Sequence, residues 1–141
     1  MALTNIFDMS GSAMTAQTGR LNAIASNMAN AETISGTEEG AYRAQRAVFK
    51  AAFNEAGVGF ANDSNRGAAV TSEMVESQAP IIRRFEPGHP LADESGHIFT
   101  SNVNVMEEMA EMIASSRSFQ MNSDAMNTAK QLVQKALTLG Q

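Results

Sequence analysis

The chain of 141 residues contains no cysteine and no tryptophan, and it has only three prolines and one tyrosine. Without cysteine it has no disulfide, no thiolate nucleophile and no cysteine ligand for zinc. The few aromatic residues mean that a core must rely on aliphatic side chains, alanine and methionine. The net charge of −5, with no cluster of lysine and arginine, argues against a nucleic-acid partner.

Long apolar runs are also missing from the chain. No stretch of about 18 apolar residues occurs, so we expect no membrane-spanning segment. The first basic residue is Arg20, and the preceding residues lack the charged and then apolar order of a secretory signal. We therefore expect no cleaved signal peptide, which leaves open export by a route that needs none.

Residues 3–31 have the spacing of an amphipathic helix, for which Thr4 is a candidate N-cap. Its apolar stripe consists of Leu3, Phe7, Met14, Leu21, Ile24 and Met28. The opposite face carries almost no charge, with Asp8 and Arg20 as its charged residues. A helix that faces solvent normally carries more charge than this.

Residues 103–138 repeat the helical pattern over a longer stretch. The stripe consists of Val105, Met109, Met112, Phe119, Met126, Val133 and Leu137. Most of these residues recur every seven positions, which is typical of helices that pack against other helices. Asn104 followed by Glu107 has the spacing of a capping box and predicts the helix start.

All three prolines and most glycines lie between these two segments. We predict a strand or short helix at 42–53, a mobile loop at 54–69, strand over 70–85 and a short strand at 98–99. The fold class is then α+β. Long N- and C-terminal helices pair as an antiparallel, coiled-coil-like bundle beside a small, irregular, β-containing middle domain. Residues 1–33 and 103–141 form the terminal helical domain for polymerisation, and residues 34–102 form the middle domain.

The helix lengths indicate what the two apolar stripes contact. At a rise of about 1.5 Å per residue, the helices reach roughly 43 and 54 Å, which a middle domain of this size does not cover. The stripes must pack on each other, on neighbouring molecules or on both. Methionine suits surfaces that meet several different neighbours. We therefore predict that both stripes are helix or subunit interfaces, and that the ends are partly disordered in the free monomer.

One group of side chains has the composition of a metal site: His89, Asp93, Glu94 and His97. The neighbouring prolines and glycines favour a solvated turn, and the sequence supplies no further histidine or any cysteine. No nucleophile motif, phosphate loop or dinucleotide fingerprint is present. We expect no metal, no other cofactor and no catalytic site, so the chain is not predicted to be an enzyme.

The run from Leu21 to Thr33, followed by Tyr42 and Arg43, resembles the N-terminal signature of flagellar rod and hook proteins. Residues 87–96, 102–109, 116–120, 126–130 and 137–141 are similar to the proximal-rod members of that family. The residues that carry the family motif are Asn22, Ser26, Asn27, Ala29, Asn30, Thr33, Tyr42, Arg43, Asn102 and Asn104.

The resemblance implies a structural subunit of the bacterial flagellar rod, which transmits torque in motility. It implies paired terminal helices that form a coiled inner tube, with the middle domain outside. The implied partners are further copies of the chain, other rod proteins, basal-body ring or rod-base components and the flagellar type III export apparatus. The implied location is the rod that crosses the periplasm, reached without a cleaved signal. The alternative is a soluble helical hairpin that serves as an export adaptor or binding module.

Overall fold

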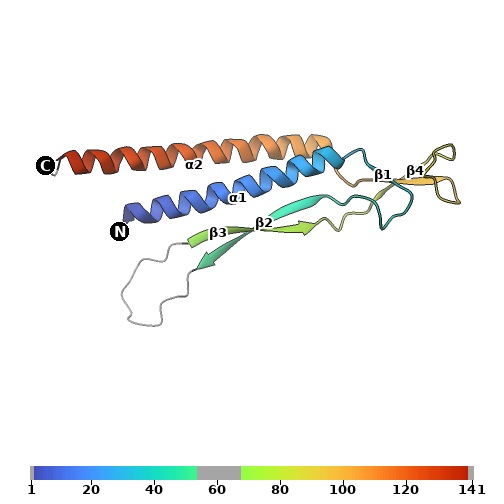
Figure 1. Cartoon of the computed structure of the whole chain (residues 1–141), viewed down its shortest axis with the longest axis horizontal. Helices are drawn as coiled ribbons and strands as arrows, with labels where there is room; N and C mark the ends of the chain where they lie inside the picture. The colour runs from blue at the N-terminus through green and yellow to red at the C-terminus, as the bar shows by residue number, and fades with distance from the viewer. Residues whose placement is uncertain (1, 54–67, 140–141) are drawn as a thin grey trace. The chain divides into compact units, whose positions relative to one another are not determined.

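A computed structural model describes residues 2–53 and 68–139 of the chain, with side chains described for 7–50 and 70–138. The elements follow the order α1 (Ala2–Asn30), β1 (Ile34–Ser35), β2 (Gln45–Phe53), β3 (Ala68–Glu76), β4 (Ile82–Phe85), β5 (His97–Thr100) and α2 (Val105–Leu139). Figure 1 shows the two long helices with the strands between them in sequence. The α+β class is confirmed, and both terminal helices lie close to their predicted bounds.

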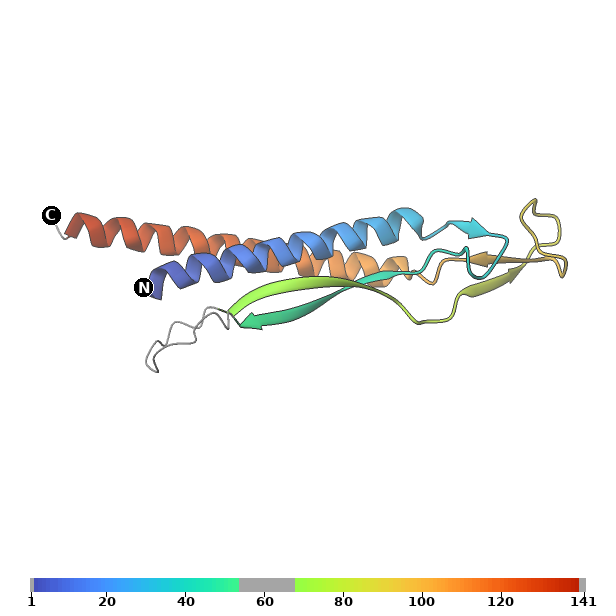
Figure 2. The ribbon, with the colours of Figure 1, turned by 60° about the horizontal axis from the view of Figure 1, so that its bottom comes forward.

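The strands form two small sheets. One has three strands in the order β1-β5-β4, and the other pairs β2 with β3. In the first sheet both pairings are antiparallel, with Ile34 and Ile82 both opposite Thr100. Figure 2 shows β4 and β5 beside each other. The ambiguous segment at 42–53 is a strand from Gln45, and the predicted strand at 70–85 is divided into β3 and β4. Most of the predicted loop at 54–69 lies outside the described residues.

The chain divides into two compact units, and each contains part of both helices. Unit 1 comprises Met1–Arg20, Val48–Glu73 and Ala114–Gln141, and unit 2 comprises Leu21–Ala47 and Met74–Ile113. Unit 1 thus holds the first part of α1 with the last part of α2, and unit 2 holds the end of α1 with the start of α2.

The core of unit 2 is a small apolar cluster beside the three-stranded sheet. Ala41, Ile81 and Phe99 pack together, and Ile98 on the same strand is fully buried. The guanidinium of Arg83 lies 5.6 Å from the centre of the Phe99 ring, so a cation covers one face of this cluster. This cluster fixes β5 immediately before the chain enters α2.

Unit 1 holds α1 against β2 and β3 through polar and cationic contacts. The backbone N–H of Val70 donates to Oγ of Ser12 (3.3 Å). The guanidinium of Arg20 lies 5.8 Å from the centre of the Phe49 ring. The ion pair between Lys50 and Glu73 joins the two strands and lowers the pKa of Glu73.

The two helix starts differ from each other. Helix α1 is already helical at Ala2, so the prediction of Thr4 as its N-cap is wrong. At α2, Oδ1 of Asn104 accepts a hydrogen bond from the N–H of Met106 (3.1 Å), as an N-cap does. The Glu107 carboxylate bonds Arg46 (3.1 Å). The cap therefore rests on Asn104, and the acid three residues later connects the helix to β2.

Gly96 is the position in the β4–β5 turn that needs a glycine. Its φ is 77°, and an added Cβ would lie 3.1 Å from side-chain atoms of Phe85 and Pro87. Replacing Gly96 with alanine should lower the free energy of unfolding by about 1–3 kcal/mol, measured by thermal or chemical denaturation. A Cβ added at Gly88 would have no other atom of the described residues within 4 Å, so Gly88 is the matched control. Equal stability of Gly96→Ala and Gly88→Ala would contradict this account.

Candidate assembly surface

The side chain of Asn27 connects three segments of unit 2. Its Oδ1 accepts hydrogen bonds from the N–H of Gln45 (2.8 Å) and the hydroxyl of Tyr42 (3.0 Å). Its Nδ2 donates to the carbonyl oxygen of Gln45 (2.8 Å), and it also bonds the carboxylate of Glu108. The side chain is only 1% exposed, so these partners take the place of water around the amide. Asn27 thus ties α1 to the start of β2 and to α2.

Asn102 also bonds the backbone just before β2. Its Oδ1 accepts from the N–H of Ala44 (2.8 Å), and its Nδ2 donates to the carbonyl oxygen of Ala79 (3.0 Å). The residues at 44 and 45 are therefore held by two asparagines, one on α1 and one just before α2. A backbone held in this way fixes where β2 begins relative to both helix segments of unit 2.

Arg46 adds an ion-pair connection between β2 and the start of α2. Its guanidinium lies 3.1 Å from Glu107 and 3.2 Å from Glu111. The hydrogen bond to Glu107 raises the pKa of Arg46, with burial opposing it and the nearby carboxylates adding to it. Arg46 and Glu107 are both about half exposed, so solvent weakens the ion pair. The pair therefore orients β2 against the start of α2 more than it stabilises the fold.

Glu108 is a buried acid on the helix face next to Asn27. The residue is 3% exposed, and its Oε2 has no hydrogen-bond partner among the described residues. Desolvation raises the pKa of Glu108 above its ordinary value, with the hydrogen bond from Asn27 acting in the opposite direction. The carboxyl of Glu108 is therefore more readily protonated in the folded chain than an ordinary glutamate.

The inner face of α2 has a heptad pattern that hydrophobicity alone does not reveal. Glu108, Ser115 and Ala129 are buried, and Asn122, which continues the same period, is half-buried. The predicted residues Met112, Phe119, Met126 and Val133 are half-buried and alternate with this series at spacings of three and four. The sequence predicts the apolar series on this face of α2, which we call the seam. It does not predict the buried polar series beside it, whose signal in the sequence is its seven-residue spacing.

The predicted stripe on α1 is partly covered. Ile24 is buried, and Phe7, Met14, Leu21 and Met28 are half-buried. The side chain of Leu3 lies outside the described residues. Apart from Ile24, the buried positions of α1 are small or polar: Ser10, Ala16, Ala23 and Asn27. Small residues at a helix contact allow two backbones to come close, while the large apolar stripe keeps accessible surface.

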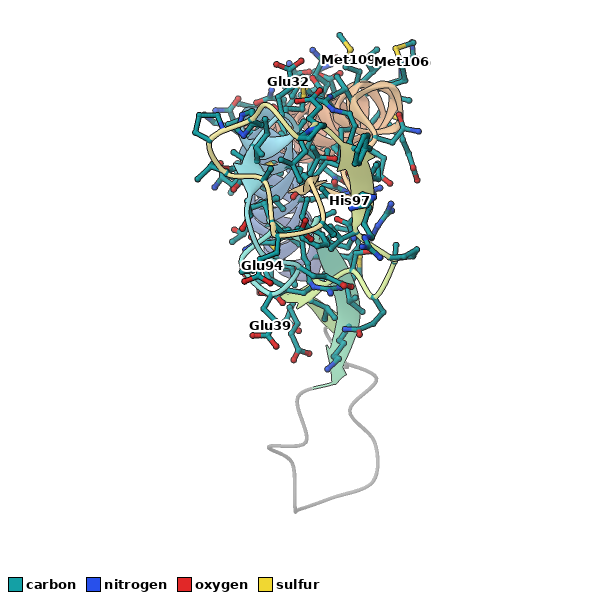
Figure 3. The ribbon with its side chains drawn as sticks, turned by 90° about the vertical axis from the view of Figure 1, so that its right-hand side faces the viewer. Glu32, Glu39, Glu94, His97, Met106 and Met109 are labelled. Atoms are coloured by element: carbon teal, nitrogen blue, oxygen red, sulfur yellow. The ribbon has the colours of Figure 1, made fainter. Side chains whose placement is uncertain are left out.

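Several predicted interface residues on α2 are exposed. Val105, Met109 and Leu137 are 40%, 48% and 68% exposed, and Met106 beside them is 76% exposed. Figure 3 shows Met106 and Met109 at the outer edge of the start of α2. Ile113, Met121 and Leu132 are exposed as well. This helix therefore presents large apolar side chains that no described part of the chain covers.

The family-motif residues separate into groups with different roles. Ser26, Asn27, Tyr42 and Asn102 belong to the hydrogen-bonded network, in which Ser26 lies 3.1 Å from the Tyr42 hydroxyl. Asn30, Thr33 and Asn104 make backbone bonds at helix ends. Asn22 and Ala29 are exposed, and Arg43 is half-buried. The structure thus brings together the residues around Asn27 and leaves Asn22 and Ala29 on the surface.

The turn with the composition of a metal site uses its polar atoms locally. Oδ1 of Asp93 accepts from the N–H groups of Ser95 (2.9 Å) and His97 (2.8 Å) and from the Ser95 hydroxyl. Nδ1 of His89 accepts from the N–H of Leu91. The hydrogen bonds that Asp93 accepts from His97 and Ser95 lower its pKa, and the bond from His97 contributes most. Among the described residues, no three acids or histidines are grouped to hold a metal.

Long helices with exposed apolar side chains are typical of proteins that assemble, and comparison with known families agrees. Residues 7–34 match the family described as "Flagella basal body rod protein". Residues 94–139 match "Flagellar basal body rod FlgEFG protein C-terminal". Both matches fall mainly on α1 and α2, the elements that carry the predicted interfaces.

Curated relatives narrow the family. The chain is 45% identical to "Flagellar basal-body rod protein FlgC" of Escherichia coli O6:H1 (strain CFT073) and of Salmonella typhimurium (strain LT2), with both chains fully covered. It is 30% identical to the protein of the same name from Borreliella burgdorferi, covering 99% of this chain and 98% of the relative. The chain belongs to the FlgC family of flagellar basal-body rod proteins.

The resemblance noted in the sequence is therefore confirmed, and it narrows to FlgC. The chain is a structural subunit of the flagellar basal-body rod and not an enzyme. Its location is the flagellar basal body, and its role is assembly with other basal-body components. No helix in the described parts of the chain is long and apolar enough to cross a membrane.

Replacing Asn27 with alanine should weaken unit 2, because it leaves Gln45, Tyr42 and Glu108 without this partner. We expect a loss of about 2–4 kcal/mol in the free energy of unfolding, measured by denaturant titration. Asn22→Ala changes an exposed residue of the same helix and should alter the free energy by less than about 0.5 kcal/mol. Two variants of equal stability would show that the Asn27 network does not hold the unit.

Proposed function

We propose that the chain builds the rod through the apolar faces of α1 and α2, which pack both within a subunit and between subunits. Residues 1–33 and 103–141 are the polymerisation domain in this proposal, and residues 34–102 lie outside the helical tube. The interface consists of the stripes Leu3, Phe7, Met14, Leu21, Ile24 and Met28 on α1 and Val105, Met109, Met112, Phe119, Met126, Val133 and Leu137 on α2.

The observation that carries the proposal is the distribution of exposed apolar side chains on α2. At 100° per residue, Met109 and Met121 point about 120° apart around the helix axis. Both are exposed, by 48% and 61%, respectively. One partner helix covers one face only, so exposure on separate sides favours contacts with more than one neighbour.

The small core of the single chain supports the same conclusion. Among the described residues, exposed large hydrophobic side chains outnumber the buried hydrophobic ones, and half of the buried ones are alanines. Burying one exposed Met, Leu or Ile side chain contributes about 1.5–3 kcal/mol. Assembly would supply much of the apolar burial that the isolated chain lacks.

The proposed partners are further copies of this chain, other rod subunits and the ring or rod-base components of the basal body. The proposed route to the rod is the flagellar type III export apparatus, without cleavage of a signal, and the proposed location is the part of the rod that crosses the periplasm. These expectations come from the family resemblance, and they agree with helices whose apolar faces exceed what one chain covers.

Replacing Phe119 with glutamate should prevent rod completion, because a charge in the half-buried seam of α2 is costly without a partner. Electron microscopy of basal bodies from cells that carry only this variant should show rings without a completed rod and hook. Gln120→Glu places the same charge on an exposed neighbouring position and should leave rods intact. Normal rods and motility with Phe119→Glu would contradict the proposed interface.

Met121→Glu separates assembly from folding, because Met121 is 61% exposed in the single chain. The variant should keep the helix content and thermal midpoint of the unmodified chain within about 2 °C, yet reduce rod completion. Circular dichroism of the purified chain checks the first expectation, and counting completed rods checks the second. Full assembly would show that this face of α2 has no neighbour.

A further inference from the structure

The start of α2 buries an acid where an apolar side chain would normally lie. Glu108 is 3% exposed and occupies a heptad position of the inner face, facing the end of α1. An ionised carboxylate in such a place is expensive unless it is paired with a cation or fully hydrogen-bonded. The groups around Glu108 therefore determine which protonation state the closed pair of helices favours.

The partners of Glu108 provide one hydrogen bond and leave one oxygen unsatisfied. A hydrogen bond from Asn27 of α1 favours the charged carboxylate, and Oε2 has no partner among the described residues. The other three hydrogen bonds of Asn27 go to Gln45 and Tyr42, so its amide has no further donor to offer. The second oxygen of Glu108 is thus buried without a donor.

The charges that face Glu108 do not neutralise it. Glu107 and Glu111 on its own helix both disfavour a further negative charge. Arg46, on β2, favours the charge, but its guanidinium is bonded to those same two acids. The end of α1, residues 21–30, carries no ionisable side chain. Tyr42 reaches Glu108 only through Asn27. A proton on the carboxyl is the simplest way to remove the uncompensated charge.

We propose that Glu108 is a proton-binding group that couples closure of α1 against the start of α2 to proton uptake, so that the pair closes more firmly as the pH falls. In the closed state the carboxyl carries the proton, which removes the charge from a group whose Oε2 has no donor among the described residues. In the open state water solvates the carboxylate, and the proton is released at neutral pH. The carboxyl is the only group that changes protonation in this step.

The direction of the effect follows from the raised pKa of Glu108 in the folded chain. Below the ordinary value of 4.5 the carboxyl is neutral in both the open and the closed states, and the stability is highest with respect to this group. As the pH rises through the interval between the ordinary and the raised pKa, the open state loses its proton first. Stability therefore falls across that interval and stays lower above it.

The consequence for assembly rests on the proposed function. A subunit that is exported before it assembles must keep its helices apart in the cytoplasm and close them in the rod. Proton-linked closure adds a pH-dependent contribution to the free energy of that closing step. A leucine at position 108 would lack this linkage, since its side chain does not titrate.

Glu108→Gln tests the proposal because glutamine has the shape of the protonated acid and does not titrate. Circular dichroism and thermal unfolding of the full purified chain are measured between about pH 3.5 and about pH 8. We expect the midpoint of Glu108→Gln to exceed that of the unmodified chain by about 2–4 °C near pH 8 and to match it near pH 3.5, below the ordinary pKa of 4.5. Glu39→Gln, at an exposed position of the same unit, should follow the unmodified chain throughout.

A difference between Glu108→Gln and the unmodified chain that does not change with pH would overturn the proposal. A direct measurement is independent of how well the variant folds: the carboxyl carbon signal of Glu108 in the unmodified chain should titrate above the ordinary glutamate value of 4.5. A Glu108 signal that titrates at or below that value would also overturn the proposal. Both measurements use the purified chain, so a failure of rod assembly in cells would count against the proposed function and leave this linkage standing.

Discussion

The arrangement of unit 2 depends on the hydrogen bonds of one buried amide, that of Asn27. Asn27 bonds both the N–H and the carbonyl oxygen of Gln45. It also bonds the hydroxyl of Tyr42 and the carboxyl of Glu108. Because an amide offers two donors and two acceptors, no other side chain of this size could make the same set. Asn102 holds the adjacent residue from the opposite direction, and the start of β2 is thereby fixed.

The structure distributes polar and apolar residues in an unusual way for a single chain. Polar and small residues line much of the helix contact, with Ser10, Asn27, Glu108 and Ser115 all buried. Large apolar residues such as Met106 and Leu137 are exposed. A chain that stabilises itself only partly by its own core, and offers its apolar surface outward, is suited to become part of a larger assembly. This distribution of residues agrees with the membership of the chain in a family of rod proteins.

Much of this fold is predictable from local patterns. The heptad spacing from Val105 to Val133 and from Phe7 to Met28 predicts both helices, and Asn104 marks the start of the second. The prediction of Thr4 as an N-cap is wrong because threonine also occurs inside helices, and helix α1 already begins at Ala2. The two-residue strand β1 has no periodicity to detect, and it exists because β5 pairs with it.

The network around Asn27 is harder to derive because its partners are distant in sequence. Asn27 and Gln45 are separated by 18 positions, and Ala44 and Asn102 by 58. The burial of Glu108 and Ser115 was missed for a related reason, since polar residues on a helix are normally assigned to the solvent face. The resemblance to the rod family marked Asn27 and Asn102 as important residues, and the structure adds what each one bonds.

The methionines on α2 have a chemical consequence beyond packing. A thioether in contact with solvent is oxidised to the polar sulfoxide, whereas one covered by a neighbouring protein reacts far more slowly. Met106, Met109 and Met121 are 76%, 48% and 61% exposed in the single chain, at different places along one helix. Since the chain has no cysteine to compete for the oxidant, these three sulfur atoms act as intrinsic reporters. Their rates of oxidation would record, residue by residue, which part of the helix is covered when a subunit enters the rod.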